Sequence, residues 1–194
     1  MPDLPPRTAL ILVDLQKAVD HRRWARHGPR NNPAAEAAAA ALLGRWRRLG
    51  WPIIHVRHDS TEPDSTYKPG GAGHAFKPEV APAAGETIIA KQVNSAFIGT
   101  DLEARLRRAG QQTVVLIGLT TEHCVSTTAR MAGNLGFTTY VIGDATATFD
   151  KRGPDGTFYP AETVHGVSLA SLHGEFATVV DTATVLRELS APVG

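Results

Sequence analysis

The sequence contains one cysteine, almost no net charge and no long apolar run. Cys124 has no second cysteine with which to form a disulfide inside the chain, which favours a reducing compartment such as the cytoplasm. A formal net charge of +1 argues against nucleic acid or an anionic membrane as the main partner. No apolar stretch approaches the ~20 residues of a membrane span, and residues 1–7 lack the basic and apolar regions of a signal peptide. We therefore expect a cytoplasmic protein that binds neither nucleic acid nor a membrane.

Apolar, β-branched segments alternate with helical segments along the whole chain. The expected strands are residues 9–13, 52–56, 87–90, 113–117, 138–142 and 177–180, and the expected helices are 33–49, 100–109, 125–135, 161–172 and 182–189. Thr100 and Glu103 predict a capping box at the start of the second helix. Strands that are apolar on both faces and separated by helices are typical of a parallel sheet covered on both sides. The pattern predicts one α/β domain over residues 1–194, with three layers and a six-stranded, mostly parallel sheet.

Polar residues follow several of these strands, at the edge where open parallel sheets bind ligands. The residues in question are Asp14 after the first strand, His58 and Asp59 after the second, Lys91 after the third, Cys124 beyond the fourth and Asp144 after the fifth. Cys124 also precedes a helix, whose first N–H groups lower a thiol pKa and hold an oxyanion. A carboxylate accepts a thiol proton, and an ammonium stabilises the resulting thiolate. The three residues Asp14, Lys91 and Cys124 therefore form a candidate nucleophilic site.

Each of these residues also has a simpler interpretation. Cys124 resembles the small buried side chains found in many cores, Asp14 suits the cap of a following helix, and Lys91 suits the surface. Their shared position at one edge of the sheet favours catalysis. Residues 59–82 and 150–160 show no clear periodicity and are expected to be loops that cover or line the site.

Three segments together resemble a known family, the isochorismatase-like cysteine hydrolases. They are residues 9–16 (ALILVDLQ), Lys91 with residues 95–97 (SAF), and residues 118–125 (GLTTEHCV), with Asp144-Ala145 as a further match. The resemblance extends from about residue 8 to residue 180. It implies amide C–N hydrolysis with Asp14 as general base, Lys91 as the stabilising cation and Cys124 as the nucleophile.

The resemblance also implies a cis peptide bond between Leu119 and Thr120. The backbone N–H groups of Thr120 and Cys124 would then form an oxyanion hole. The family commonly assembles as homodimers or homotetramers, and we expect this chain to do the same and to use no cofactor.

Within the family, this sequence is most similar in type to the metal-free amidohydrolases such as N-carbamoylsarcosine amidohydrolase. Metal-binding nicotinamidases carry an Asp and a His after the second strand, where this chain has His58 and Ser60, so we expect no metal. Whether His58 or His74 binds one stays open. The implied substrate is a small amide, carbamoyl or ureido compound. The side chains expected to line its pocket are Gln16, Trp24, Asn94, Phe97 and Thr121.

Other polar residues receive structural interpretations. We expect His123 on a helix surface, because adjacent helical residues point about 100° apart, and His165 and His173 in structural positions. Arg57 is expected to pair with Asp59 or Glu62. Two alternative functions stay open, a nicotinamidase-like hydrolase and a thiol-based redox or binding protein on the same fold.

Overall fold

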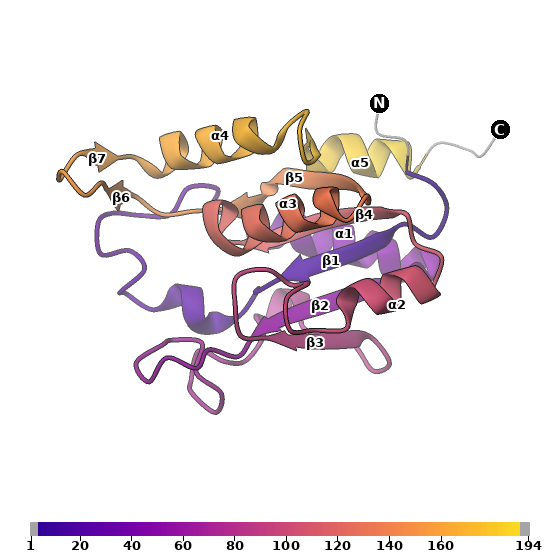
Figure 1. The fold of residues 1–194 in the computed structure, drawn as a ribbon, viewed down its shortest axis with the longest axis horizontal. Coiled ribbons are helices and arrows are strands. Elements are labelled where there is room, and N and C mark those ends of the chain that lie inside the picture. Colours follow the sequence, from indigo (N-terminus) through magenta and orange to yellow (C-terminus); the bar gives the residue numbers. More distant parts are fainter. Residues whose placement is uncertain (1–3, 191–194) are drawn as a thin grey trace.

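The computed structural model describes residues 4–190, which form a six-stranded sheet covered by helices on both faces (Figure 1). The strands are β1 Ala9–Val13, β2 Ile53–His58, β3 Thr87–Lys91, β4 Thr113–Leu119, β5 Thr138–Ala147 and β8 Thr178–Val180. Their order in the sheet is β3-β2-β1-β4-β5-β8, and every neighbouring pair is parallel. The predicted three-layer α/β fold with six strands is confirmed.

The helices follow the expected alternation with the strands. They are α1 Ala35–Leu49, α2 Leu102–Arg108, α3 Ser126–Asn134, α4 Ala161–Leu172 and α5 Thr182–Glu188, with 3-10 turns at Lys17–Asp20 and Pro78–Val80 and a π turn at Thr121–Val125. The first of them begins in an Ala-rich run and ends at Gly50, whose φ of +62° is the left-handed conformation that glycine favours. None of the helices in residues 4–190 combines the length and hydrophobicity needed to cross a bilayer.

The alternation of β1 side chains divides the core into two layers. Leu10 and Leu12 pack with buried residues of α1 and α5 on one face. Ile11 and Val13 pack with buried residues of α2, α3 and α4 on the other face. A strand that is apolar on both faces is expected for the interior of a covered parallel sheet. The central position of β1 places the residue that follows it, Asp14, near the middle of the sheet edge.

Three local expectations differ from the structure. The segment expected to be a loop at 150–160 contains an antiparallel pair, β6 Lys151–Arg152 and β7 Phe158–Tyr159. The strand β5 continues to Ala147, so Asp144 lies within it and accepts hydrogen bonds from the N–H and hydroxyl of Thr182 at 2.8 and 2.9 Å. Asp144 therefore fixes the start of α5.

The third difference concerns the start of α2. The residue that precedes this helix is Asp101, one position later than expected. The Thr100 hydroxyl accepts from the Leu102 N–H at 3.3 Å, while Glu103 pairs with Arg107 at the surface. The predicted capping box is wrong because Glu103 interacts along the helix and not back toward Thr100.

Candidate active site

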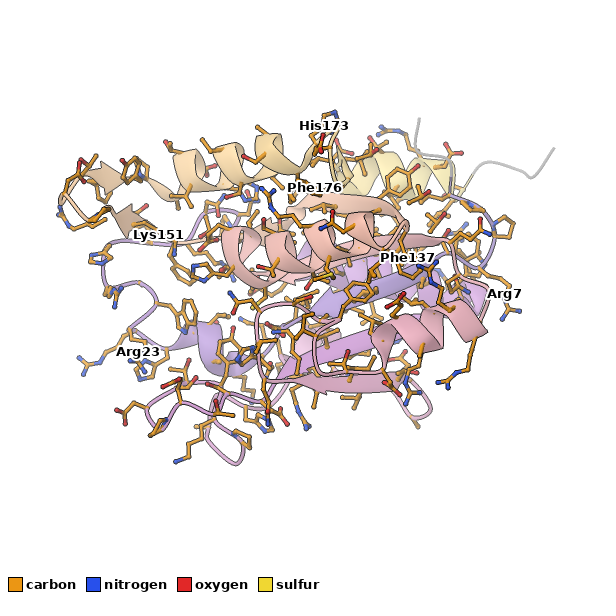
Figure 2. All side chains as sticks on the ribbon, in the orientation of Figure 1. Arg7, Arg23, Phe137, Lys151, His173 and Phe176 are labelled. Atoms are coloured by element: carbon orange, nitrogen blue, oxygen red, sulfur yellow. The ribbon has the colours of Figure 1, made fainter. Side chains whose placement is uncertain are left out.

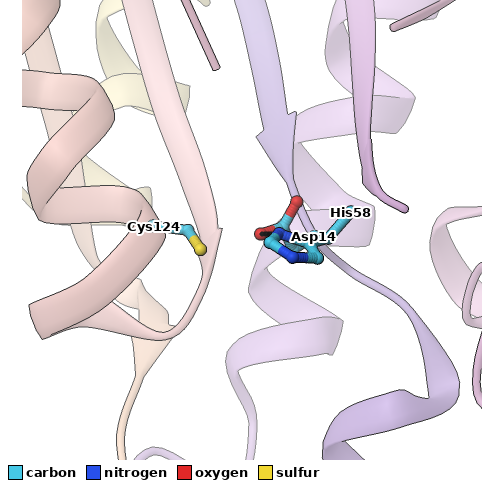
Figure 3. Close-up of side chains that lie close together, drawn as sticks. All are labelled: Asp14, His58 and Cys124. Carbon is cyan, nitrogen blue, oxygen red and sulfur yellow. Dashed lines mark ion pairs between the residues drawn. The ribbon is translucent and has the colours of Figure 1, made fainter. Parts of the chain in front are cut away.

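Three polar side chains from separate strand ends come together beyond the carboxyl edge of the sheet. Asp14 directly follows β1, Lys91 is the last residue of β3, and Cys124 lies in the π turn after β4. The Lys91 side chain passes the end of β2, which lies between β3 and β1, to reach Asp14. Figure 2 shows the side chains on the whole fold, and Figure 3 shows the Cys124 sulfur pointing toward Asp14, with His58 beside the carboxylate.

The backbone at this edge is unusual at two positions. Gly118 has a φ of +131°, and a Cβ there would lie 2.0 Å from the carbonyl oxygen of Val13, its register partner in β1. Only glycine therefore lets β4 approach β1 so closely. Asp14 has a φ of +53°, a left-handed conformation that Asp tolerates better than most residues. This turn directs the Asp14 side chain into the site.

The Lys91 ammonium lies among three acceptors. Its Nζ is 2.7 Å from Asp14 Oδ2, 2.8 Å from His58 Nδ1 and 3.4 Å from Cys124 Sγ. The side chains of Lys91 and Asp14 are 0% and 1% exposed. Burying either charge alone would cost several kcal/mol, roughly the penalty of an unpaired ion in a protein interior. The ion pair is therefore what holds a carboxylate and an ammonium at this depth.

Burial determines the protonation of the acid and the thiol. Desolvation raises the pKa of Asp14, and Lys91 partly offsets this effect. Desolvation and the neighbouring Asp14 charge raise the pKa of the Cys124 thiol. The expectation that this pKa is lowered is wrong, because desolvation, which raises it, is the largest effect on the Cys124 thiol. The raised pKa favours the protonated thiol at neutral pH.

A cavity of about 170 Å³ opens in front of the sulfur. Its lining residues are Asp14, Trp24, His58, Ser65, Tyr67, Asn94, Leu119, Thr120, His123 and Cys124. Two polar atoms in this lining, Asp14 Oδ1 and Thr120 Oγ1, are buried without a hydrogen-bond partner among residues 4–190. Unpaired buried polar atoms are costly unless a ligand or solvent satisfies them. The two atoms are therefore available to a polar ligand in the inner cavity.

A larger cavity of about 510 Å³ lies outside the first one. The two share Trp24, Ser65 and His123 in their linings, and the outer cavity is also bounded by Arg23 and Lys151. The inner cavity holds roughly five to six water volumes at ~30 Å³ each. The two cavities are therefore adjacent, with the smaller one beside the Cys124 sulfur.

The segment before the cysteine has the expected backbone. The peptide bond between Leu119 and Thr120 is cis, as predicted. The Thr120 carbonyl accepts from the N–H groups of His123 and Val125 at 3.2 and 3.3 Å, while no acceptor within residues 4–190 contacts the Thr120 N–H. The following residue, Thr121, is buried, and its hydroxyl is 2.9 Å from His165 Nδ1.

The side chains expected to bind substrate divide into two groups. Trp24 and Asn94 line the inner cavity. The other three side chains do not line it. The Gln16 amide is hydrogen-bonded to the backbone of His58, the last residue of β2. Phe97 stacks on Phe137 with ring centroids 5.9 Å apart, and the Thr121 hydroxyl contacts His165. This placement does not support substrate contact by these three, because their polar groups or rings are already occupied within the protein.

The sequence interpretation did not predict that Ser65, Tyr67 and Leu119 line the cavity, and it gave His58 and His123 no substrate-binding role. Tyr67 and Ser65 come from the long segment 59–82, where no periodicity indicates which side chains face the site. His123 is exposed as expected, yet it also borders both cavities. Arg57 pairs with Asp59 at 2.8 Å, which confirms that part of the interpretation.

The residues at the position of the nicotinamidase metal site do not fit a metal. His58 Nδ1 already contacts the Lys91 ammonium at 2.8 Å, and His74 Nε2 contacts Asp59 at 2.7 Å. Atoms of Asp14, His58 and Cys124 converge within 4.8 Å of one another, a spacing that suits a metal ion, but the point on which they converge is the Lys91 ammonium. A divalent ion there would be repelled by that charge.

Comparisons with known proteins agree with the fold and identify a family. The isochorismatase domain family matches residues 8–184. The isochorismatase family protein YrdC of Bacillus subtilis is 50% identical over 182 residues, which are 94% of this chain and 96% of YrdC. A crystal structure of an isochorismatase-family protein from Chromobacterium violaceum has a TM-score of 0.93 at 51% identity, covering 97% of this chain and 96% of that one.

More distant relatives have names that describe amide hydrolysis. Maleamate amidohydrolase of Pseudomonas putida is 32% identical over 200 residues, covering 95% of this chain and 89% of that enzyme. N-carbamoylsarcosine amidase from Thermoplasma acidophilum has a TM-score of 0.69 at 25% identity, covering 97% and 99% of the two chains. The chain therefore belongs to the isochorismatase family of hydrolases.

Proposed function

We propose that this protein is a cysteine-dependent amidohydrolase that cleaves a C–N bond of a small primary amide, carbamoyl or ureido compound. The observation that carries this proposal is the buried Lys91 ammonium, which contacts both the Asp14 carboxylate and the Cys124 sulfur. An arrangement of this kind serves proton transfer from a thiol to a carboxylate, since the total charge beside the ammonium stays the same.

The first half of the proposed reaction forms a thioester. Asp14 removes the thiol proton while Cys124 Sγ attacks the substrate carbonyl carbon. The resulting oxyanion accepts hydrogen bonds from the backbone N–H groups of Thr120 and Cys124, each worth roughly 3 kcal/mol of the barrier. The C–N bond then breaks, and Asp14 returns its proton to the leaving nitrogen, which departs as ammonia or an amine.

The second half regenerates the enzyme. Asp14, again a carboxylate, accepts a proton from water as the water oxygen attacks the thioester carbonyl carbon. The C–S bond breaks, the acid product leaves, and the proton on Asp14 returns to Cys124. Lys91 remains an ammonium throughout, because one negative charge stays near it at every step, on the Asp14 carboxylate, on the Cys124 sulfur or on the substrate oxyanion.

The size and polarity of the inner cavity support a small substrate. A carbamoyl or primary amide group fits within the volume of about 170 Å³, and the unpaired Asp14 Oδ1 is an acceptor for its N–H. The amide-hydrolysing relatives support the same reaction class. The residues at the position of the nicotinamidase metal site do not favour the nicotinamidase alternative. His58 is hydrogen-bonded to Lys91, and His74 is hydrogen-bonded to Asp59.

The test is ammonia release from a panel of primary amides, ureides and carbamoyl compounds that includes maleamate, N-carbamoylsarcosine and nicotinamide. Cys124→Ala should lower turnover of any accepted compound by about 10⁴-fold or more, as loss of a nucleophile does in other hydrolases. A Cys124→Ala protein that keeps full turnover contradicts the proposal. Absence of any turnover together with reversible sulfenate formation at Cys124 favours the thiol-sensor alternative.

The proposal includes assembly as a homodimer or homotetramer. Light scattering coupled to size-exclusion chromatography measures the molar mass directly, and a monomer at assay concentration contradicts this part alone.

A further inference from the structure

The neutral imidazole of His58 occupies the one remaining contact of the Lys91 ammonium. An ammonium has three N–H donors and no acceptor. Asp14 Oδ2 and Cys124 Sγ take two of them, and His58 Nδ1, at 2.8 Å, takes the third. A nitrogen that accepts a hydrogen bond carries no proton, so the imidazole proton resides on Nε2.

The surroundings of His58 keep the ring neutral. Burial lowers its pKa, the Lys91 charge lowers it further, and the charges of Asp14 and Asp59 only partly compensate. A protonated His58 would place two positive charges within hydrogen-bond distance. The neutral tautomer with a free Nδ1 lone pair is therefore the resting form.

The ring is held in this orientation from several sides. The Gln16 side chain accepts from the His58 N–H at 2.8 Å and donates to its carbonyl at 3.2 Å. The Tyr67 ring packs against the imidazole with centroids 5.3 Å apart. Gln16 thus fixes the backbone of His58 and does not line the cavity.

The other ring nitrogen, Nε2, has no hydrogen-bond partner within residues 4–190, and His58 lines the inner cavity. With Nδ1 turned to Lys91, the Nε2 edge is the part of the ring left to face a ligand.

We propose that His58 is both a positioning residue for Lys91, through Nδ1, and a substrate-binding residue, through Nε2–H. The substrate would then carry an acceptor oxygen, such as a carbonyl or carboxylate, on the side of the cavity formed by β2. The substrate-binding part rests on the proposed amidohydrolase function, and the positioning part does not.

Two substitutions separate the two contacts. Asn carries its side-chain oxygen at the distance of Nδ1 from the backbone, so His58→Asn keeps an acceptor for Lys91 and removes the Nε2 donor. Gln carries its amide one carbon further out, so His58→Gln keeps a donor toward the cavity and removes the acceptor. His58→Ala removes both. Circular dichroism and thermal melting establish that each variant is folded.

The first readout is the rate at which iodoacetamide alkylates Cys124 as a function of pH, which is unambiguous because the chain has one cysteine. His58→Asn should retain the wild-type profile. His58→Gln and His58→Ala should shift it to higher pH by about one unit, because a less firmly placed ammonium stabilises the thiolate less.

The second readout is KM against kcat on an accepted amide. His58→Asn should raise KM about tenfold with kcat nearly unchanged, the loss of one substrate hydrogen bond, whereas His58→Gln should keep KM closer to the wild type.

Identical behaviour of folded His58→Asn, His58→Gln and His58→Ala in both readouts would overturn the inference and leave His58 a merely structural residue. Wild-type behaviour of all three would overturn it as well. If the wild-type protein hydrolyses no amide of the panel, the proposed function fails, while the alkylation profiles still decide whether His58 positions Lys91.

Discussion

The Lys91 ammonium and the Asp14 carboxylate are 2.7 Å apart, and both side chains are shielded from solvent. The two residues come from β3 and from the end of β1, which are not neighbours in the sheet. Their pairing is therefore a tertiary interaction that links two separate strand ends under the site. A buried pair of this kind is weak evidence for stability as such, but loss of one partner leaves an uncompensated charge.

Lys91→Met should destabilise the protein by about 3–5 kcal/mol at neutral pH, the usual cost of breaking a buried ion pair. The pKa of Asp14 is already raised in the folded state from its ordinary value of 3.8, and removing the ammonium raises it further. The folded variant therefore binds a proton that the unfolded chain releases. Its stability deficit should shrink as pH falls and grow as pH rises through the folded pKa.

Urea unfolding of Lys91→Met and the wild-type protein at about pH 5 and about pH 8 measures this dependence. The matched control is Arg105→Met, which breaks the exposed pair with Asp101 and should cause no measurable change. Equal deficits of Lys91→Met at the two pH values would contradict the assignment of the charge to Asp14.

Asp14→Asn should separate thiol reactivity from turnover. The negative charge of Asp14 is one of the causes that raise the pKa of Cys124, while Lys91 lowers it. Removing the carboxylate leaves the sulfur beside an unopposed ammonium, so alkylation by iodoacetamide at neutral pH should become several-fold faster. Amide turnover should fall by about 10²–10⁴-fold, because no group then moves the proton to the leaving nitrogen.

Parallel measurements of alkylation and ammonia release on the same Asp14→Asn sample provide the test. A variant that is alkylated faster and still hydrolyses amides at the wild-type rate would show that Asp14 is not the base. A variant slower in both would show that Asp14 activates the thiol at rest, contrary to the raised thiol pKa.

The sheet and the three central side chains could be predicted from the sequence for a physical reason. Strands that are apolar on both faces require covering helices, and residues directly after such strands converge at one edge. Asp14, Lys91 and Cys124 all follow this rule, and the structure brings them together. The comparisons with known proteins support the same family and fold.

The placement of Gln16 could not be predicted in the same way. Residues two apart share a side only while the chain stays extended. Asp14 has a φ of +53°, which breaks the extended run, so Gln16 turns to the backbone of β2. Tyr67 was missed because the segment 59–82 has no period that distinguishes an inward side chain from an outward one. The raised thiol pKa depends on burial by distant residues, which local sequence does not reveal.

Removal of metal ions should leave activity unchanged. The three side chains whose ligand atoms converge, those of Asp14, His58 and Cys124, have the positive charge of Lys91 among them. Dialysis against EDTA and against 1,10-phenanthroline, followed by the ammonia assay and elemental analysis, measures this directly. A loss of turnover that one divalent metal restores would contradict the expectation and place a metal in the reaction. Lys91→Ala is a useful comparison in the same assays. It removes the positive charge that repels a metal ion and keeps the side chains of Asp14, His58 and Cys124.

Gly118→Ala should destabilise the protein by more than about 3 kcal/mol, at the upper end of the range for single substitutions. The new Cβ would lie 2.0 Å from the carbonyl oxygen of Val13, so β4 would have to move away from β1. Gly118 also has a φ of +131°, a conformation that residues with a side chain rarely adopt, which by itself costs an alanine about 1–3 kcal/mol. The control for a positive φ without a steric clash is Gly85→Ala, where φ is +86° and, apart from the neighbouring residues of the chain, nothing lies within 4 Å of the added carbon. Urea unfolding of the two variants should therefore show a much larger loss of stability for Gly118→Ala.

The same shift of β4 would carry Asp14 away from Cys124. The rates of alkylation and turnover of any folded Gly118→Ala should therefore both change, while Gly85→Ala should match the wild type in both. Equal losses of stability for the two alanine variants would mean that the contact between β1 and β4 relaxes freely and does not fix the geometry of the site.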